Sequence, residues 1–253
     1  MSTPKSPNTN LDTKVAFVTG GSRGIGAAIV ERLAAAGAAV AFTYQSSETQ
    51  AQALAGRIEA AGGRALALRA DAADPQALAA AIDTAANRFG HLDILVNNAG
   101  VFLGGHVADF TLADFDRTVA VNLRAVFAAT QAAARHLSDG GRIINIGSTN
   151  AMRVPFAGAA VYAMSKSALT GLVKGLAHDL GPRGITVNNV LPGPIDTDMN
   201  PADTDFGKSL HAYMALPRHG RPQEVAGMVA WLAGPEACFV TGADLAVDGG
   251  FAA

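Results

Sequence analysis

Short runs of apolar and β-branched residues alternate along this chain with longer, alanine-rich segments of helical periodicity. The pattern begins with an expected strand over Lys14–Thr19 and an expected helix over Gly24–Ala36, and it ends with an expected strand over Asp244–Val247. Alternation with short connections is typical of βαβ units, because neighbouring parallel strands need a crossover that is usually helical. The sequence therefore predicts an α/β fold in which helices cover both faces of a parallel sheet.

The elements between these ends keep the same rhythm. Asp74 and Pro75 are the expected cap and first residue of one helix, and Thr111 with Asp114 resembles a capping box at the start of another. The remaining expected elements are strands at residues 39–44, 65–69, 92–96, 142–146 and 186–191, and helices at residues 48–61, 111–134, 162–180 and 222–233. With the first and last strands, the pattern predicts a sheet of seven strands.

One stretch breaks the rhythm without marking a second domain. Residues 192–221 are rich in Pro, Asp and Gly, and loops of this length in compact domains are usually functional. The stretch follows the carboxyl end of an expected strand, where open α/β sheets bind ligands. We interpret residues 193–217 as a substrate lid, with a surface insertion as the alternative. The lid would belong to a single domain over residues 14–253, preceded by a flexible tail at residues 1–13.

The overall composition disfavours several classes of function. The chain has 253 residues, 49% hydrophobic and 16% charged, with a net charge of −2, so it should fold and gives no electrostatic reason to expect nucleic acid. Its longest run of apolar residues and glycine, Leu33–Phe42, spans ten residues, whereas a membrane span needs about 20. The only cysteine is Cys238, which fits a reducing, cytoplasmic location. The six histidines form no pair at metal-ligand spacing, so we expect no metal site.

A glycine-rich loop joins the first expected strand to the first expected helix, with the sequence Thr-Gly-Gly-Ser-Arg-Gly-Ile-Gly at residues 19–26. Its spaced glycines would permit a tight turn, close approach of the backbone to a pyrophosphate, and close packing of helix on sheet. The helix start offers unpaired N–H groups to phosphates. The loop indicates a dinucleotide site, with an ordinary strand–helix turn as the alternative. Its expected binding residues are Gly20, Ser22, Arg23, Gly24, Ile25 and Gly26.

The end of the second expected strand indicates which dinucleotide is bound. NAD-binding sheets usually place an Asp or Glu there to bind the ribose 2′-hydroxyl. Here the residues include Tyr44, Gln45 and Ser46, and the first acid is Glu48. Arg23 adds a cation from the glycine loop. Because an arginine with hydroxyls and no carboxylate suits a 2′-phosphate, we expect NADP(H).

Tyr162 and Lys166 are four residues apart in an expected helix, and Ser148 follows an expected strand upstream. A four-residue step places two side chains on one face of a helix. A nearby ammonium favours the phenolate and should lower the tyrosine pKa from its ordinary value near ~10. The pattern predicts acid–base chemistry by Tyr162. A serine hydrolase is disfavoured, because Ser148 lacks the second glycine of a nucleophile elbow.

Taken together, these motifs resemble the short-chain dehydrogenase/reductase family over nearly the whole chain from Lys14 onward. The motifs occur in the family's order: the glycine loop, Asp71-Ala72, Asn-Asn-Ala-Gly at residues 97–100, Asn122, Ser148, Tyr162 with Lys166, and Pro192-Gly193. The resemblance implies one Rossmann-type, doubly wound domain with a seven-stranded parallel sheet. It also implies a homotetramer built through the two long helices.

The same resemblance implies hydride transfer between NADP(H) and a small-molecule carbonyl/alcohol pair. Tyr162 would donate a proton to the developing alkoxide, Ser148 would bind the same oxygen, and Lys166 would hold the nicotinamide ribose. Asn122 would fix a water that links Lys166 to solvent. Besides the residues already given, those implied to contact the cofactor are Asp71, Ala72, Asn98, Ala99, Gly100, Tyr162, Lys166, Pro192, Gly193, Ile195 and Thr197.

The expected substrate pocket is largely apolar, which suits a neutral, moderately bulky ketone. Its expected residues are Ser148, Met152, Val154, Phe156, Tyr162 and Met199, with Phe206, Leu210 and Tyr213 as further candidates from the lid.

A rival function remains open. The second half of the chain resembles one bacterial branch of the family, which includes carbonyl reductases and a cyclic-di-GMP-binding biofilm-dispersal protein. The chain could therefore be a regulatory protein that binds a nucleotide on the same scaffold with little or no turnover. Arg153, Arg218 and Arg221 could meet the phosphates. The complete catalytic set and the acidic lid argue against this function.

Overall fold

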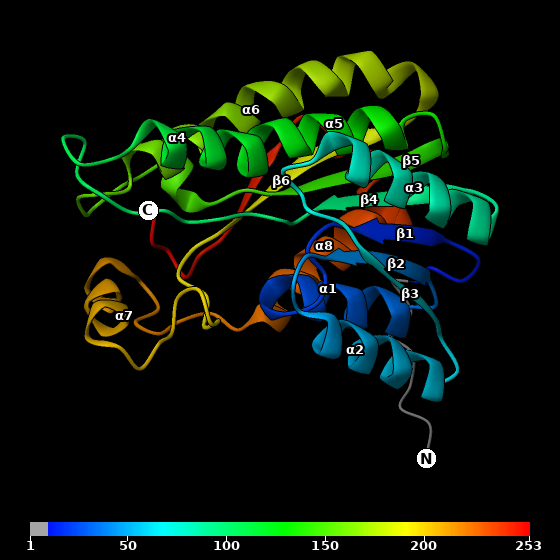
Figure 1. The fold of residues 1–253 in the computed structure, drawn as a ribbon, viewed down its shortest axis with the longest axis horizontal. Helices are drawn as coiled ribbons and strands as arrows, with labels where there is room; N and C mark the ends of the chain where they lie inside the picture. The colour runs from blue at the N-terminus through cyan, green and yellow to red at the C-terminus, as the bar shows by residue number, and fades with distance from the viewer. Residues whose placement is uncertain (1–9) are drawn as a thin grey trace.

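The computed structural model describes residues 10–253, and in them seven strands form one sheet (Figure 1). The strands are β1 Val15–Val18, β2 Ala39–Tyr44, β3 Arg64–Arg69, β4 Leu92–Asn97, β5 Leu137–Ile146, β6 Thr186–Pro192 and β7 Asp244–Val247. They lie in the order β3-β2-β1-β4-β5-β6-β7, and every neighbouring pair is parallel. The predicted seven-stranded parallel sheet is confirmed.

Helices cover both faces of the sheet, as the alternation predicted. The α-helices in the described residues are α1 Gly24–Ala35, α2 Glu48–Ala60, α3 Pro75–Phe89, α4 Leu112–Val119, α5 Ala125–Ala133, α6 Ala160–Leu180, α7 Asp205–Leu210 and α8 Pro222–Ala233. In Figure 1, α1, α2 and α8 lie on one face, and α3, α4, α5 and α6 lie on the other. Of these described helices, none is long and apolar enough to cross a membrane.

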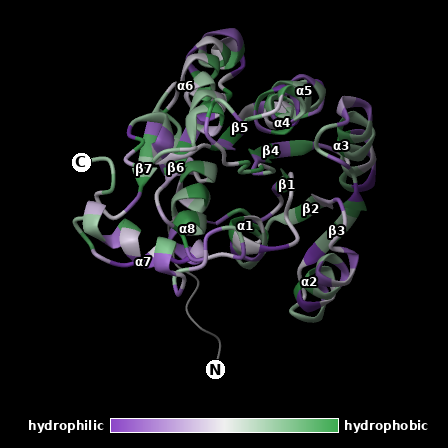
Figure 2. Cartoon of the chain, turned by 60° about the vertical axis from the view of Figure 1, so that its left-hand side comes forward, coloured by the Kyte–Doolittle hydropathy of each residue, from purple (hydrophilic) through white to green (hydrophobic). Residues whose placement is uncertain are grey.

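Two hydrophobic cores lie on the two faces of the sheet. Successive residues of β1 alternate between them: Val15 and Phe17 belong to the core under α3 and α5, and Ala16 and Val18 to the core under α1 and α8. Successive side chains of a strand point to opposite faces, so a strand covered on both sides is apolar throughout. Figure 2 shows this as hydrophobic colouring along the central strands.

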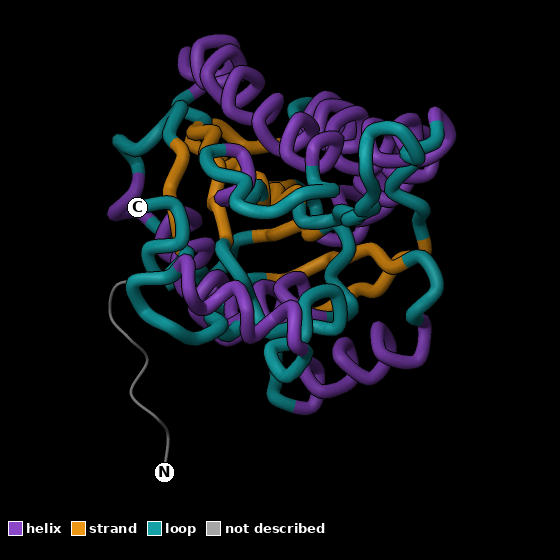
Figure 3. Tube along the Cα trace, turned by 90° about the vertical axis from the view of Figure 1, so that its left-hand side faces the viewer, coloured by secondary structure: helices purple, strands orange, loops and turns teal. Residues whose placement is uncertain are grey.

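The strand order creates a ligand crevice beside β1. The chain moves outward from β1 through β2 to β3, then returns to the other side of β1 with β4. The loops that leave β1 and β4 therefore diverge, and open α/β sheets bind ligands at such switch points. Figure 3 views the molecule from the side where the loops gather over the strand ends.

Local structure refines several expectations. Asp74 and Thr111 cap α3 and α4 through their side-chain oxygens, as predicted. The expected continuous helix over residues 111–134 is instead divided, because a π-helical turn, η1 Ala120–Arg124, separates α4 from α5. Such turns occur frequently at functional sites. The expected lid contains α7 and a 3₁₀ turn, η4 His211–Tyr213.

Of the tail expected at residues 1–13, residues 1–9 lie outside the described residues. The remaining part packs onto the domain: Leu11 is buried, and its backbone N–H donates to the Ala36 carbonyl oxygen at 2.8 Å. The packed domain therefore begins before Lys14.

Candidate active site

Two joined cavities lie at the carboxyl ends of the strands. We call the first the glycine-loop cleft, because Gly20 and residues 22–26 line it together with the ends of β2 and β4. We call the second the Tyr162 cavity, because Tyr162, Lys166 and Ser148 line it. The two share the residues Ile25, Asn98, Gly100, Thr197 and Met199. A ligand that fills the cleft can therefore extend into the cavity.

The glycine-loop cleft is shaped by close backbone packing. Gly20 and Gly24 have φ angles of +64° and +54°, in the left-handed region that glycine adopts at little cost. A Cβ at Gly26 would collide with the Gly20 carbonyl oxygen and with the Asn98 side chain. The Asn98 amide donates to the carbonyl oxygens of Thr19 and Gly20 at 3.0 and 2.8 Å, which fixes the loop against β4.

All the predicted cofactor residues line one or both of these spaces. Those in the glycine-loop cleft are Gly20, Ser22, Arg23, Gly24, Ile25, Gly26, Tyr44, Gln45, Ser46, Asp71, Ala72, Asn98, Ala99, Gly100 and Thr197. Those in the Tyr162 cavity, some of them shared, are Ile25, Asn98, Gly100, Tyr162, Lys166, Pro192, Gly193, Ile195 and Thr197. The sequence prediction thus converges on one continuous surface.

Charged side chains gather at the outer end of the cleft. The Asp71 carboxylate accepts a hydrogen bond from the Gln45 amide at 2.8 Å and lies 3.5 Å from the Arg117 guanidinium. Arg23 lies 3.6 Å from Asp198 of the lid, and both side chains are mostly exposed. Arg117 lines the cleft but was missed from the sequence, because it stands in α4 without any motif around it.

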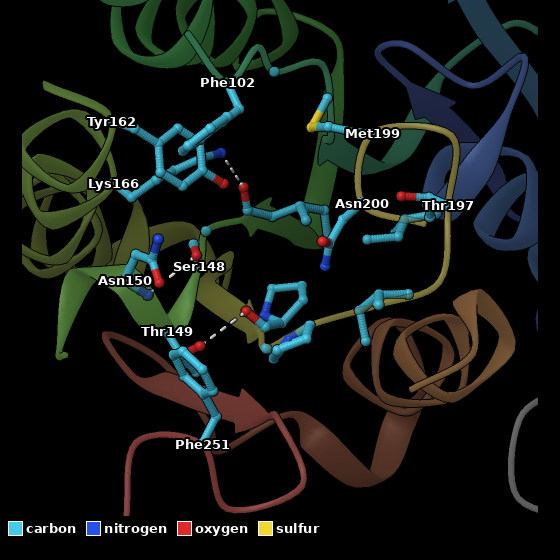
Figure 4. Close-up of a pocket in the computed structure, with 18 of the residues that line it drawn as sticks. Phe102, Ser148, Thr149, Asn150, Tyr162, Lys166, Thr197, Met199, Asn200 and Phe251 are labelled. Atoms are coloured by element: carbon cyan, nitrogen blue, oxygen red, sulfur yellow. Dashed lines mark hydrogen bonds between the residues drawn. The ribbon is translucent and has the colours of Figure 1, made fainter. Parts of the chain in front are cut away.

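Tyr162 and Lys166 project from the first turns of α6, which begins at Ala160, two residues before the expected start. Lys166 Nζ lies 5.8 Å from the centre of the Tyr162 ring and donates to the Ile146 carbonyl oxygen at 2.8 Å (Figure 4). Ser148 Oγ accepts from the Asn150 N–H at 3.1 Å. The Phe102 ring packs edge-on against Tyr162, with 5.0 Å between ring centres.

Burial governs the titration of these two groups. It raises the pKa of Tyr162, and a hydrogen bond with Ser148 opposes this rise. Burial also lowers the pKa of Lys166 to about 8. The expected lowering of the Tyr162 pKa by Lys166 is therefore wrong for the protein alone. The physical reason is that the low dielectric penalises the phenolate, while the lysine directs its hydrogen bond to a backbone carbonyl.

Asn122 lies in the π-helical turn η1 and is fully buried. Its amide donates to the Val101 carbonyl oxygen at 2.9 Å and to Ser165 Oγ at 3.1 Å, and its oxygen accepts from the Val101 N–H at 2.9 Å. Ser165 in turn donates to the Tyr162 carbonyl oxygen at 2.7 Å. In the structure Asn122 therefore ties the loop after β4 to the start of α6, next to Lys166.

The Tyr162 cavity contains most of the predicted substrate residues. Ser148, Phe156, Tyr162 and Met199 line it, as do the further lid candidates Phe206 and Leu210. Three predicted residues are absent from its lining: Met152, Val154 and Tyr213, whose side chains are instead partly or largely exposed. The 3₁₀ turn η2 Thr149–Ala151 directs the chain away from the cavity after Asn150, so nearness in sequence to Ser148 was a poor guide.

Sequence reasoning missed several residues that do line the cavity: Phe102, Thr149, Asn150, Pro194, Asn200 and Phe251. Phe102 lies two residues after the Asn-Asn-Ala-Gly motif, and this position could have pointed to it. No local signal marks Phe251, which reaches the cavity from the far end of the chain.

The three arginines considered for a phosphate ligand behave differently from one another. The Arg218 guanidinium donates two hydrogen bonds to the Glu224 carboxylate, at 2.7 and 2.9 Å. The Arg153 guanidinium donates to the carbonyl oxygens of Phe251 and Ala253 at 2.9 and 3.3 Å. Arg221 lies 4.0 Å from Glu224. Two of the three guanidinium groups thus already have close partners within the chain.

Comparisons with known proteins agree with this geometry. A family model described as "Enoyl-(Acyl carrier protein) reductase" matches residues 20–252. The "Cyclic-di-GMP-binding biofilm dispersal mediator protein" of Escherichia coli (strain K12) is 51% identical over 240 residues, which cover 95% of this chain and 98% of that protein.

Two solved structures are similar over nearly their whole length. A short-chain dehydrogenase/reductase from Serratia marcescens BCRC 10948 is 62% identical, with a TM-score of 0.95 and coverage of 96% of this chain and 100% of that chain. A short chain dehydrogenase from Burkholderia cenocepacia J2315, solved in complex with NADP, is 56% identical, with the same TM-score and coverage.

Proposed function

The chain belongs to the short-chain dehydrogenase/reductase family of oxidoreductases, and from this premise we propose that it is an NADPH-dependent carbonyl reductase acting on a neutral ketone or the corresponding alcohol. One observation carries the proposal. Ser148, Tyr162 and Lys166 line a cavity that is continuous with the glycine-loop cleft. The proposed proton donor and the proposed dinucleotide site would therefore open into the same space.

The residues of the cleft fit NADP(H). The Gly20–Gly26 packing leaves backbone where a Cβ would block approach, and the start of α1 supplies N–H groups for the pyrophosphate. Arg23 and Ser46 would hold the 2′-phosphate, Asp71 the adenine, and Lys166 the nicotinamide ribose. Similar structures crystallised with NADP support this choice. The cofactor would supply the hydride, and the protein orients both partners and handles the proton.

The proposed proton donor is Tyr162. Burial raises its pKa, so the phenol stays protonated at neutral pH and can donate to an alkoxide as it forms. Ser148 would bind the same oxygen and hold it in place. Asn122 would act as a positioning residue, since its amide anchors the loop carrying Val101 and the start of α6. The protonated phenol is the form that ketone reduction needs.

The test is Tyr162→Phe, which removes only the hydroxyl. We expect turnover to fall by roughly 10²- to 10⁴-fold, the usual worth of a positioned general acid, while NADPH binding measured by fluorescence stays at the wild-type level. Tyr213→Phe is the matched control, because Tyr213 does not line the cavity and should lose no turnover. Wild-type reduction by Tyr162→Phe would refute the proposal.

A second candidate function rests on the 51% identity to the Escherichia coli protein whose name records cyclic-di-GMP binding. Under this alternative the chain would bind that nucleotide and show little or no turnover. Titration calorimetry with cyclic-di-GMP, beside NADPH consumption over a ketone panel, separates the two. Tight nucleotide binding with no turnover on any ketone would favour the regulatory function.

We further propose a cytoplasmic homotetramer. One observation supports self-association: large apolar side chains are exposed on α4, α5 and α6, at Leu112, Phe127 and Met164. Exposed apolar surface commonly marks an interface. Sedimentation equilibrium at several concentrations tests this, and a monomer at all of them would contradict it.

A further inference from the structure

The Phe251 ring closes the Tyr162 cavity from an unexpected direction. The residue is 1% exposed and lines the cavity, although it comes from the far end of the chain. Figure 4 shows Phe251 beyond Thr149, at the opposite end of the cavity from Tyr162 and Phe102. A substrate held at Tyr162 would therefore meet this ring at the other end of the cavity.

Hydrogen bonds and a tight turn hold the segment 248–253, and with it the Phe251 ring, in this position. The Asp248 carboxylate accepts hydrogen bonds from the N–H groups of Gly250 and Ala252 at 2.9 and 3.0 Å. Gly249 and Gly250 have φ angles of +62° and +79°, which make the turn tight at little cost. The Leu216 N–H donates to the Gly249 carbonyl oxygen at 2.8 Å, so the turn is also attached to the lid.

Arg153, two residues after η2, holds this segment by hydrogen bonds. Its guanidinium donates to the carbonyl oxygens of Phe251 and Ala253 at 2.9 and 3.3 Å, and it lies 5.9 Å from the centre of the Tyr213 ring. Tyr213 packs edge-on against Phe251, with 6.4 Å between ring centres. The arginine thus links the chain after η2, the lid and the segment that carries Phe251.

Phe251 also belongs to a small hydrophobic core separate from the two main ones. Its other members are Leu210 and Met214 of the lid region, with Phe156 packed against them. Leu210 and Phe156 line the cavity as well. Moving the ring would therefore change both the depth of the cavity and the packing of the lid.

We propose that Phe251 determines substrate specificity by limiting the size of the ketone, and that Arg153 positions it. The inference rests on the proposed function, because it names what selects the ketone at the same site. The lining has no charged side chain except Lys166, so the selected substrates are neutral, and the phenylalanine rings favour an aryl group. Aryl alkyl ketones of increasing alkyl length are the probe series.

The experiment compares kcat/KM for acetophenone, propiophenone, butyrophenone and valerophenone in Phe251→Ala and Phe251→Leu. We expect the ratio of the longest to the shortest ketone to rise by about tenfold in Phe251→Ala, since one methylene in an apolar pocket is worth at least that much. Phe251→Leu, which keeps an apolar side chain and should fold if the alanine variant does not, should show a smaller rise. Phe239→Ala is the matched control, because Phe239 is fully exposed.

Arg153→Met should shift the same ratio by about threefold, through KM rather than kcat, and Arg153→Lys should restore much of it. A wild-type size ranking in both Phe251 variants would overturn the proposal. A wild-type ranking in Arg153→Met alone would overturn the positioning role. The same ketones are also titrated calorimetrically into the NADPH complex, so that size selection is measured by binding if no ketone is reduced. Absence of reduction would then contradict the proposed function and leave the Phe251 proposal to be decided by that ranking.

Discussion

The glycine-loop cleft and the Tyr162 cavity lie side by side but are built from different parts of the chain. The cleft is shaped mainly by the backbone of one loop, fixed by the Asn98 amide. The cavity is shaped by phenylalanine side chains from four separate segments, at positions 102, 156, 206 and 251. A site lined by backbone changes little when side chains are substituted, which suits a ligand that stays the same. A site lined by side chains changes shape with single substitutions. Changes in the cleft should therefore alter cofactor binding, and changes in the phenylalanine side chains of the cavity should alter substrate choice.

The largest effect that would sharpen this contrast is expected from Gly26→Ala. The added Cβ meets the Gly20 carbonyl oxygen and the Asn98 side chain, and overpacking of this kind costs about 2 kcal/mol. If the loop must move to relieve the clash, NADPH affinity should fall by roughly 30-fold. Fluorescence titration with NADPH measures the change.

Gly56→Ala is the control for this variant. Gly56 also lies within a helix, α2, but a Cβ there meets nothing within 4 Å. It should leave NADPH binding unchanged and stabilise the protein slightly, because alanine is the better helix former. If Gly26→Ala bound NADPH as tightly as the wild type, close backbone packing would not be what makes the cleft, and the contrast would fail.

The same contrast explains how much could be predicted from the sequence. The fold followed from apolar runs such as β1, whose alternate residues pack into two cores. The cleft followed from glycines adjacent in sequence, whose role is local. Both depend on interactions within or next to one βαβ unit, so the residue pattern contains the information.

The Tyr162 cavity could be predicted only in part. Ser148, Tyr162 and Lys166 were found by motif, but Phe251 reaches the cavity only through the turn at Asp248 and the distant Arg153. The titration of Tyr162 was also mispredicted, because sequence spacing shows a neighbouring charge but not the desolvation that raises the tyrosine pKa. Long-range packing and desolvation are the quantities that a local pattern lacks.

A second prediction uses pH to test Lys166, the residue of the cavity that is expected to bind the cofactor as well. Since burial lowers the pKa of Lys166 to about 8, the ammonium is present below that pH and lost above it. If the ammonium holds the nicotinamide ribose, NADPH affinity should fall about tenfold between pH 7 and pH 9, as the charged fraction falls from about 90% to about 10%. Titrations of wild type and Lys166→Met across this range measure it. The variant should be flat, while Lys174→Met, on the exposed side of α6, should keep the wild-type slope.

The smallest effect should come from Arg23, at the outer end of the cleft. Its side chain is 62% exposed and lies 3.6 Å from Asp198, so its attraction for a 2′-phosphate is screened by water and shared with a carboxylate. Arg23→Gln should weaken NADPH about fivefold, or about 1 kcal/mol, and leave NADH unchanged. Arg57→Gln is the control. Arg57, on α2, is equally exposed but pairs with Glu31 on α1, and neither residue lines the cleft.

Because the Arg23 contact is electrostatic, the loss of NADPH affinity in Arg23→Gln should become smaller as salt is raised from 0.05 to 0.5 M. Over that range the screening length becomes shorter by on the order of threefold. The Gly26→Ala effect, which is steric, should not shrink. Equal losses of NADPH and NADH in Arg23→Gln would show that the arginine shapes the loop rather than reading the phosphate. Cofactor choice would then belong to Gln45, Ser46 and Arg117, the polar side chains that line the same end of the cleft.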